Sequence, residues 1–171
     1  SDTADYRSAS AAVTVSLAAQ GAAQNTSGAG SDLLTGFENL SGGIYADVLT
    51  GDDGANTLAG NTGDDTLDGG GGNDRLDGGV GNDWADYEHA AGAVTASLTA
   101  GTASGAAGND TLVLIERLVG SAFADTLTGD GGANILRGLN GNDLLYGMGG
   151  DDTLRGNNGD DRLDGGTGTD T

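Results

Sequence analysis

The chain contains no cysteine, no proline and no lysine among its 171 residues. Without cysteine it can form neither a disulfide nor a thiolate metal site. Its only strong cations are six arginines, so it has no basic patch that would attract nucleic acid or an anionic membrane surface. No apolar run approaches the roughly 20 residues of a membrane-spanning helix. We therefore expect neither nucleic acid binding nor membrane insertion.

Acidic residues dominate the charge, yet glutamate is scarce. The formal net charge is −20, and the acidic residues are aspartates except for Glu38, Glu88 and Glu116. A solvated acidic face or a disordered acidic tail would use both acids freely. Short aspartates in tight turns are instead common ligands of Ca²⁺, which prefers oxygen. The bias toward aspartate therefore points to calcium.

A nine-residue unit repeats in two uninterrupted blocks, residues 42–83 (block 1) and 120–171 (block 2). One unit reads GNTGDDTLD at 60–68, and another reads GNNGDDRLD at 156–164. Position one is always glycine, position six is aspartate or asparagine, and position eight is leucine. The register never slips within a block, which indicates a repeat architecture rather than chance similarity.

The nine positions predict a tight turn followed by a very short strand. Glycines at positions one and four permit φ > 0 and close backbone approach. The last three residues alternate out, in, out, with a single inward leucine. Two units, 18 residues, return the chain to its start, so equivalent turns stack about 4.8 Å apart. We expect the position-eight leucines to form the core, among them Leu67, Leu76, Leu145, Leu154 and Leu163.

On these residues the chain resembles the RTX (repeats-in-toxin, haemolysin-type) family, whose nonapeptide is G-G-x-G-x-D-x-U-x. The resemblance implies an all-β fold, a right-handed parallel β-roll (β-helix) solenoid with calcium ions between stacked turns. It also implies export of the unfolded chain through a type I secretion route, with Ca²⁺ driving folding outside the cell.

The resemblance assigns metal-binding roles to positions six and four of the turns. Position-six side chains and turn carbonyls would hold each ion. The position-six residues are Asp47, Asn56, Asp65, Asp74, Asp83, Asp125, Asn134, Asp143, Asp152, Asp161 and Asp170. The position-four glycines are Gly63, Gly72, Gly81, Gly141, Gly150, Gly159 and Gly168.

Pairing of turns 18 residues apart gives seven candidate calcium sites. The pairs are 47/65, 56/74, 65/83, 125/143, 134/152, 143/161 and 152/170. One leucine per nine residues is a thin core, and stacked aspartates repel one another, so we expect folding to depend on the ion. Seven ions would bring the net charge from −20 to −6.

Four turns depart from the pattern. Asp47 and Asp125 follow Tyr45 and Phe123, which stand where the position-four glycine should be. A Cβ at that position resists left-handed geometry. The turns at 56 and 134 carry asparagine, a neutral ligand, at position six. We expect these four turns to bind calcium weakly or not at all.

A longer repeat encloses the first. Asp2-Thr3-Ala4-Asp5-Tyr6 recurs as Asp83-Trp84-Ala85-Asp86-Tyr87, and AVTVSL at 12–17 recurs as AVTASL at 93–98. One continuous solenoid is thus divided into a first interlude (1–41), block 1, a second interlude (84–119) and block 2. We interpret the interludes as enlarged coils with longer strands. We expect the following interlude side chains to pack in the core: Val13, Val94, Leu17, Leu98, Tyr6, Tyr87 and Trp84.

Catalytic patterns find little support. His89 is the only histidine, so a Ser-His-Asp triad would depend on it alone, and no G-x-S-x-G elbow occurs. The glycine-rich turns lack the lysine of a phosphate-binding loop. Aspartate pairs can hydrolyse glycosides, but metal binding explains the nine-residue spacing better. We expect the chain not to be an enzyme.

The sequence leaves the biological role open between three alternatives. We favour an extracellular calcium-binding module that serves as scaffold or spacer of a larger secreted protein. Thr169-Asp170-Thr171 stands where Ser1-Asp2-Thr3 stands in the longer repeat, so the array could continue in the same chain or stack end to end into a filament or surface layer. A glycan-binding segment of an adhesin is the third alternative.

Overall fold

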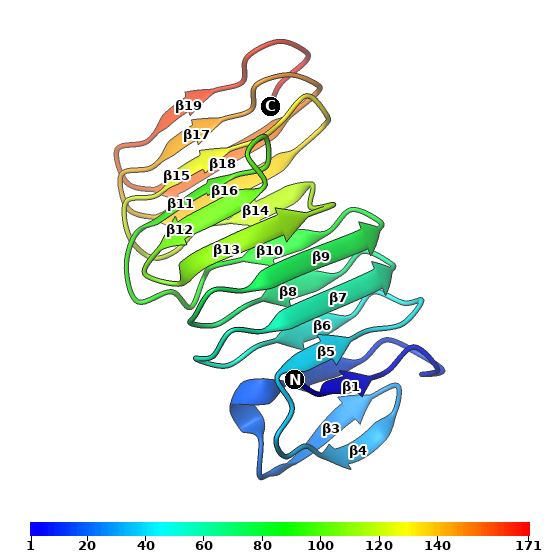
Figure 1. The fold of residues 1–171 in the computed structure, drawn as a ribbon. Helices are drawn as coiled ribbons and strands as arrows, with labels where there is room; N and C mark the ends of the chain where they lie inside the picture. The colour runs from blue at the N-terminus through cyan, green and yellow to red at the C-terminus, as the bar shows by residue number, and fades with distance from the viewer.

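A computed structural model describes all residues, 1–171, as a parallel β-roll with the termini at opposite ends (Figure 1). Two long sheets, parallel except where β12 pairs with its neighbours, form its faces, and the chain passes from one to the other. This arrangement confirms the all-β parallel roll expected from the sequence. The only helix is the short 3₁₀ turn η1 (Leu17–Ala19), and no helix is long and apolar enough to cross a bilayer.

The strands fall into two long sheets and one separate pair. In spatial order the ten-stranded sheet contains β1 (Thr3–Asp5), β5 (Asn39–Ser41), β7 (Thr57–Thr62), β9 (Arg75–Val80), β13 (Gly108–Val113), β12 (Thr102–Gly105), β11 (Val94–Ser97), β15 (Thr126–Thr128), β17 (Leu144–Tyr146) and β19 (Arg162–Asp164). The seven-stranded sheet contains β18 (Thr153–Asn158), β16 (Ile135–Asn140), β14 (Arg117–Val119), β10 (Trp84–Asp86), β8 (Thr66–Asp68), β6 (Val48–Thr50) and β2 (Thr14–Ser16). The pair is β3 (Ala23–Ser27) with β4 (Gly30–Leu33).

The strand register confirms that two nonapeptides make one coil. Leu49 of β6 lies opposite Leu67 of β8 in the seven-stranded sheet. On the other face, Leu58 of β7 lies opposite Leu76 of β9. Each pair is 18 residues apart, and block 2 has the same spacing.

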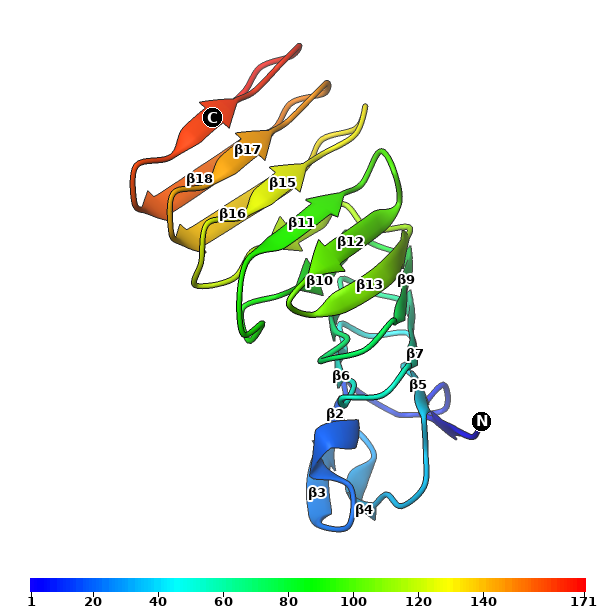
Figure 2. The ribbon, with the colours of Figure 1, turned by 60° about the vertical axis from the view of Figure 1, so that its left-hand side comes forward.

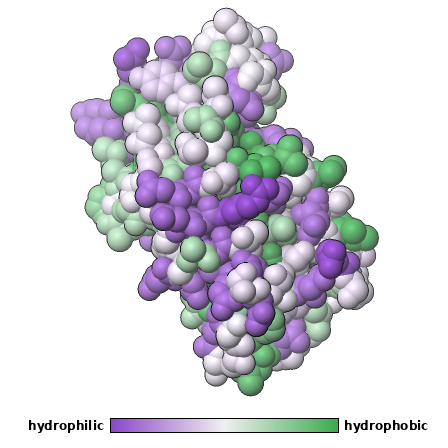
Figure 3. Space-filling model, viewed as in Figure 1, coloured by the Kyte–Doolittle hydropathy of each residue, from purple (hydrophilic) through white to green (hydrophobic).

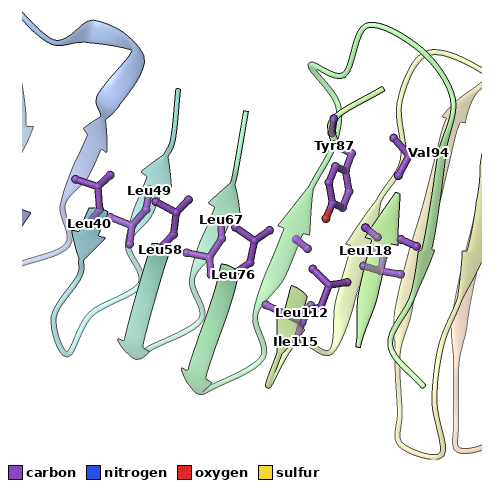
Figure 4. Packing of buried hydrophobic residues seen from close by; sticks show 14 of the residues in the cluster. Leu40, Leu49, Leu58, Leu67, Leu76, Tyr87, Val94, Leu112, Ile115 and Leu118 are labelled. Carbon is purple, nitrogen blue, oxygen red and sulfur yellow. The ribbon is translucent and has the colours of Figure 1, made fainter. Parts of the chain in front are cut away.

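The core is a ladder of position-eight leucines between the two sheets (Figure 4). Leu67, Leu76 and Leu145 are fully buried, and Leu154 is nearly so. In the strands the flanking residues point outward, so one side chain in three reaches the core. Leu163 differs from our expectation, because β19 is an edge strand and leaves this side chain 45 % exposed.

Glycine serves the turns in a different way from the one predicted. The position-four glycines of regular turns do have positive φ, such as +128° at Gly63, although Gly81 does not. Position two also has positive φ, even where the residue is Asn61 or Leu139. No position-one glycine has positive φ. These glycines are needed for close approach, because a Cβ on Gly60 would lie 2.2 Å from the Asp65 carboxylate.

The strands of the second interlude correct one expectation, because they are no longer than those of the blocks. Each has three to six residues. The chain runs from β10 to β11, turns back through β12, and turns again into β13, with both pairings antiparallel. β13 then lies parallel to β9 below it, and β11 lies parallel to β15 above it. An alternating sequence fits either strand direction, so the pattern could not reveal the hairpins.

These hairpins bend the roll. Three strands, β11 to β13, stand in the ten-stranded sheet where one would complete a coil, while β10 pairs directly with β14 in the other sheet. Two extra strands widen one face by about 10 Å. Figure 2 shows the two blocks tilted against each other at this point.

The interlude side chains fill the core mostly as expected. Val13, Val94 and Leu17 are buried, and Leu98 packs against the core while partly exposed. Tyr6 and Tyr87 are buried as well.

Trp84 corrects our expectation, because Ala85 takes the inward position of β10 instead. The Trp84 ring lies on the outer face of the seven-stranded sheet, under the guanidinium groups of Arg137 at 4.4 Å and Arg117 at 5.4 Å. On the face that Figure 3 shows, hydrophobic residues stand in patches among hydrophilic ones.

Candidate metal centre

Hydrogen bonds between stacked turns join the position-six residues into rows. In each of the seven predicted pairs, the backbone N–H of the first residue donates to Oδ1 of the residue 18 positions later. The donor–acceptor distances are 2.7–3.0 Å. The structure therefore brings together all seven pairs that the spacing predicts. The ladder uses Oδ1 of each accepting aspartate and leaves Oδ2 free for another partner.

The second oxygen has no hydrogen-bond partner in five aspartates. The buried, unpartnered atoms are Oδ2 of Asp65, Asp74, Asp83, Asp143 and Asp152. A buried polar atom without a partner is rare and costly in a native protein. Five such atoms at equivalent places of one repeat fit a shared bound cation, because an ionised carboxylate is a good ligand for one.

The turn backbone shapes a cradle around each unpartnered oxygen. At Gly60, a Cβ would lie 2.2 Å from Asp65 Oδ2 and 2.7 Å from the carbonyl oxygen of Gly78 in the next coil. The same arrangement recurs at Gly147, where a Cβ would lie 2.4 Å from Asp152 Oδ2 and 2.6 Å from the carbonyl of Gly165. Glycine at position one thus lets a carboxylate and a carbonyl oxygen of successive coils converge.

Burial disfavours the charged form of these aspartates. It raises the pKa of Asp65 to about 6 and that of Asp74 to about 7. The negative charges of neighbouring aspartates add to the effect, while hydrogen bonds from the turn below oppose it. Burial likewise raises the pKa of Asp83, Asp143 and Asp152. The hydrogen bonds that the protein supplies therefore offset the burial of these ionised carboxylates only in part.

The donor set fits Ca²⁺. This ion takes six to eight oxygen ligands, including carboxylates and backbone carbonyls, in flexible geometry. No point in the chain gathers three or more histidine, cysteine or acidic side chains, as a compact side-chain site would. Each site would instead combine carboxylates of two coils with turn carbonyls.

The turns that depart from the repeat satisfy their own side chains. Oδ2 of Asp47 accepts the backbone N–H of Gly43, and Oδ2 of Asp125 accepts that of Ser121. In the asparagine turns, Oδ1 of Asn56 accepts the N–H of Asp52 and Oδ1 of Asn134 accepts that of Asp130. These contacts agree with the prediction that the four turns bind calcium weakly, which stays a prediction.

The two last position-six residues lie at the surface. Asp161 is half-buried and Asp170 is exposed. Their Oδ1 atoms still accept the N–H groups of Asp143 and Asp152. The rows thus pass from fully buried to solvated carboxylates.

Two row members escaped the sequence reasoning. Asp74 donates its N–H to Asp110 Oδ1 at 2.9 Å, and Asp83 donates its N–H to Glu116 Oε2 at 2.9 Å. Each acceptor takes the place of a position-six residue in the next coil. A signal existed for Asp110, because GAAGNDTLV at 105–113 fits the nonapeptide. For Glu116 the signal was Leu118 two residues later and Gly120 after four.

His89 lies apart from the rows. Its ring is 79 % exposed, with Nδ1 3.2 Å from Asp68 Oδ2. It contacts no serine hydroxyl that could act as a nucleophile. This exposed position agrees with the solvated histidine that the sequence predicts.

Comparison with known families agrees with this repeat geometry. The RTX calcium-binding nonapeptide repeat matches four times, at residues 34–60, 50–85, 115–145 and 137–171. These matches cover both blocks and more than half of the chain. No individual curated protein matches it. RTX repeats bind Ca²⁺, form β-rolls and are typical of secreted proteins. The chain belongs to the family of RTX calcium-binding nonapeptide repeats.

Proposed function

We propose that this chain is a non-catalytic folding module that acquires its structure by binding calcium outside the cell. In this role it serves as a scaffold or spacer of a larger protein exported by a type I route. The ligands are the position-six carboxylates and the carbonyl oxygens of successive turns. Calcium binding belongs to the family, and the assignment of residues and role is our inference.

The observation that carries the proposal is the set of unpartnered oxygens. Five buried aspartates keep Oδ2 without a hydrogen bond, each beside a position-one glycine. Ionised carboxylates so placed oppose folding, because burial removes their hydration and the neighbouring charges repel. A divalent cation removes both penalties. Calcium would therefore turn the rows from the main obstacle to folding into its main support.

The location of the core supports the same conclusion. Each nonapeptide strand before β19 contributes one buried side chain, the position-eight leucine. Most position-six aspartates, by contrast, are buried, and they recur at both ends of each coil. A fold that gains little from apolar burial depends more on linkage to a ligand.

The calcium affinity of extracellular modules suits this role. Extracellular calcium modules bind with dissociation constants of about 10⁻⁴ to 10⁻³ M. Such sites would fill outside the cell and stay empty in the cytosol. The chain would thus remain unfolded before export and fold after it.

Circular dichroism tests this proposal. We expect a mostly disordered chain in EDTA and a β-sheet spectrum after addition of about 1 mM Ca²⁺. Mg²⁺ is the control, because its shorter bonds and strict octahedral geometry suit flexible carbonyl-rich sites poorly. A β-rich chain that melts cooperatively in EDTA, with no change on adding Ca²⁺, would refute the proposal.

A further inference from the structure

The junction between block 1 and block 2 contains a carboxylate pair outside the regular repeats. The turn that ends at Asp83 is the last of block 1, and the chain returns above it as the segment 113–116 leading into β14. The N–H of Asp83 donates to Glu116 Oε2 at 2.9 Å. One coil below, the N–H of Asp65 donates to Asp83 Oδ1 at 2.7 Å. Glu116 therefore occupies the place of a position-six aspartate.

The backbone at the junction reproduces the cradle of a regular turn. A Cβ on Gly78 would lie 2.3 Å from the carbonyl oxygen of Leu114 and 2.5 Å from Asp83 Oδ2. At the regular turn below, the corresponding atoms around Gly60 are the Gly78 carbonyl and Asp65 Oδ2. Leu114 has φ +51°, a left-handed conformation that is rare outside glycine. With this conformation, the Leu114 carbonyl oxygen lies against Gly78 as the Gly78 carbonyl oxygen lies against Gly60.

Asp83 supplies an independent sign of a missing ligand. Its side chain is fully buried, and Oδ2 has no hydrogen-bond partner. The positive charge of Arg117 acts on Asp83 from a distance, but its guanidinium lies over Trp84 and 3.6 Å from Asp64, and it makes no ion pair with Asp83. No salt bridge reaches Asp83. The buried oxygen therefore faces the cradle without a protein partner.

We propose that Asp83, Glu116 and the Leu114 carbonyl form a calcium site that joins the two blocks. The inference rests on the proposed function and extends it to a position that is not a nonapeptide turn. The row also continues upward, because Asn134 Nδ2 donates to the Glu116 carbonyl at 3.1 Å. Calcium at this site fixes β14 onto the last turn of block 1, next to the bend that the hairpins create.

The test counts ions on matched variants of the full chain. Glu116→Gln keeps an oxygen that can accept the Asp83 N–H but removes the charge. Glu88→Gln is the control, because it removes the same charge from an exposed residue of the same interlude. Native mass spectrometry in calcium gives the number of bound ions. We expect Glu116→Gln to lose one ion, or to bind it about 10-fold or more weakly, while Glu88→Gln binds as the wild type does.

Terbium gives a second reading at the site itself. Trp84 is the only tryptophan and directly follows Asp83, so Tb³⁺ excited through tryptophan reports on ions beside it. Luminescence should fall in Glu116→Gln and not in Glu88→Gln. If Glu116→Gln does not fold, Glu116→Asp keeps the charge while withdrawing the carboxylate by one methylene, and it should weaken the same ion.

The outcomes separate this inference from the proposed function. A wild-type chain that binds no calcium overturns both. A wild-type chain that binds calcium, with unchanged ion count, affinity and luminescence in the Glu116 variants, overturns the junction site alone. Selective loss of one ion supports it.

Discussion

The hydroxyl of Tyr87 donates a 3.0 Å hydrogen bond to Oδ2 of Asp110. In the regular turns the equivalent oxygen is buried and unpartnered. Asp110 is buried too, and its Oδ1 continues the ladder by accepting the N–H of Asp74. The phenol thus gives one row carboxylate the partner that its counterparts lack, so the second interlude satisfies this position from within the protein.

Tyr87→Phe should therefore destabilise the chain in calcium. The substitution keeps the ring and leaves a buried carboxylate oxygen without a partner, which costs about 1–3 kcal/mol. Tyr146→Phe is the control, since Tyr146 is partly exposed on the outer face of β17. Denaturant unfolding at fixed Ca²⁺ measures both variants. Equal stability of the two would contradict the role assigned to the Tyr87 hydroxyl.

Aspartates of regular and irregular turns should respond differently to neutralisation. Asp65→Asn removes the charge of an unpartnered oxygen, so the calcium concentration needed for folding should rise about 10-fold or more. Asp47→Asn affects a carboxylate whose Oδ1 accepts the N–H of Val13 and whose Oδ2 accepts that of Gly43. It should lower stability by about 1 kcal/mol with little change in calcium dependence. Calcium titrations followed by circular dichroism distinguish the two, and equal shifts would refute unequal sites.

A methyl group should be tolerated at one turn glycine and not at another. Gly63 has φ +128°, and a Cβ there would lie 2.4 Å from the carbonyl oxygen of Tyr45. Gly63→Ala should cost about 1–3 kcal/mol through strain alone, with the collision adding to it. Gly131 has ordinary φ and open space around it, so Gly131→Ala should be nearly neutral. The midpoints of thermal unfolding in calcium measure the contrast; a Gly63→Ala variant as stable as Gly131→Ala would contradict it.

Acid should act in opposite directions with and without calcium. The folded-state pKa values of Asp65 and Asp74, about 6 and about 7, lie above the ordinary 3.8. Without calcium, the folded state binds these protons more tightly, so the contribution of both groups to stability is greatest below pH 3.8 and is lost as the pH rises through 6 to 7. With calcium, the same protons compete with the ion, so calcium affinity should fall as the pH drops below 7.

Circular dichroism in EDTA at acidic and at neutral pH tests the first part. More β structure is expected in acid. Calcium titrations at the same two pH values test the second part, where a higher midpoint is expected in acid. A calcium midpoint that does not change with pH would show that these carboxylates do not bind the ion.

Much of the roll could be predicted from the sequence, because the nine-residue repeat of the sequence is also half a coil of the structure. Glycine at position one and leucine at position eight recur without a slip, and that spacing determines the coil, the core and the seven pairs. Glu116 and Asp110 were missed for a physical reason. Asp110 is position six of the unit 105–113, and Glu116 is position six of the unit 111–119. These units overlap by three residues, so an alignment in steps of nine residues cannot include both. The ladder tolerates this overlap because it requires only an acceptor oxygen at the right height, whether aspartate or glutamate supplies it.

The hairpins of the two interludes lie on opposite sides of the molecule. In the first interlude β3 contacts β2 of the seven-stranded sheet, and Gln24 hydrogen-bonds the Ser16 backbone there. In the second interlude the hairpins belong to the ten-stranded sheet. The corresponding Val13 and Val94 are 81 residues apart, which is nine nonapeptides or four and a half coils. The half coil carries equivalent segments of the longer repeat onto opposite faces of the roll, so that β2 stands in the seven-stranded sheet and β11 in the ten-stranded sheet. The two interludes therefore present their hairpins to different faces, although their sequences correspond.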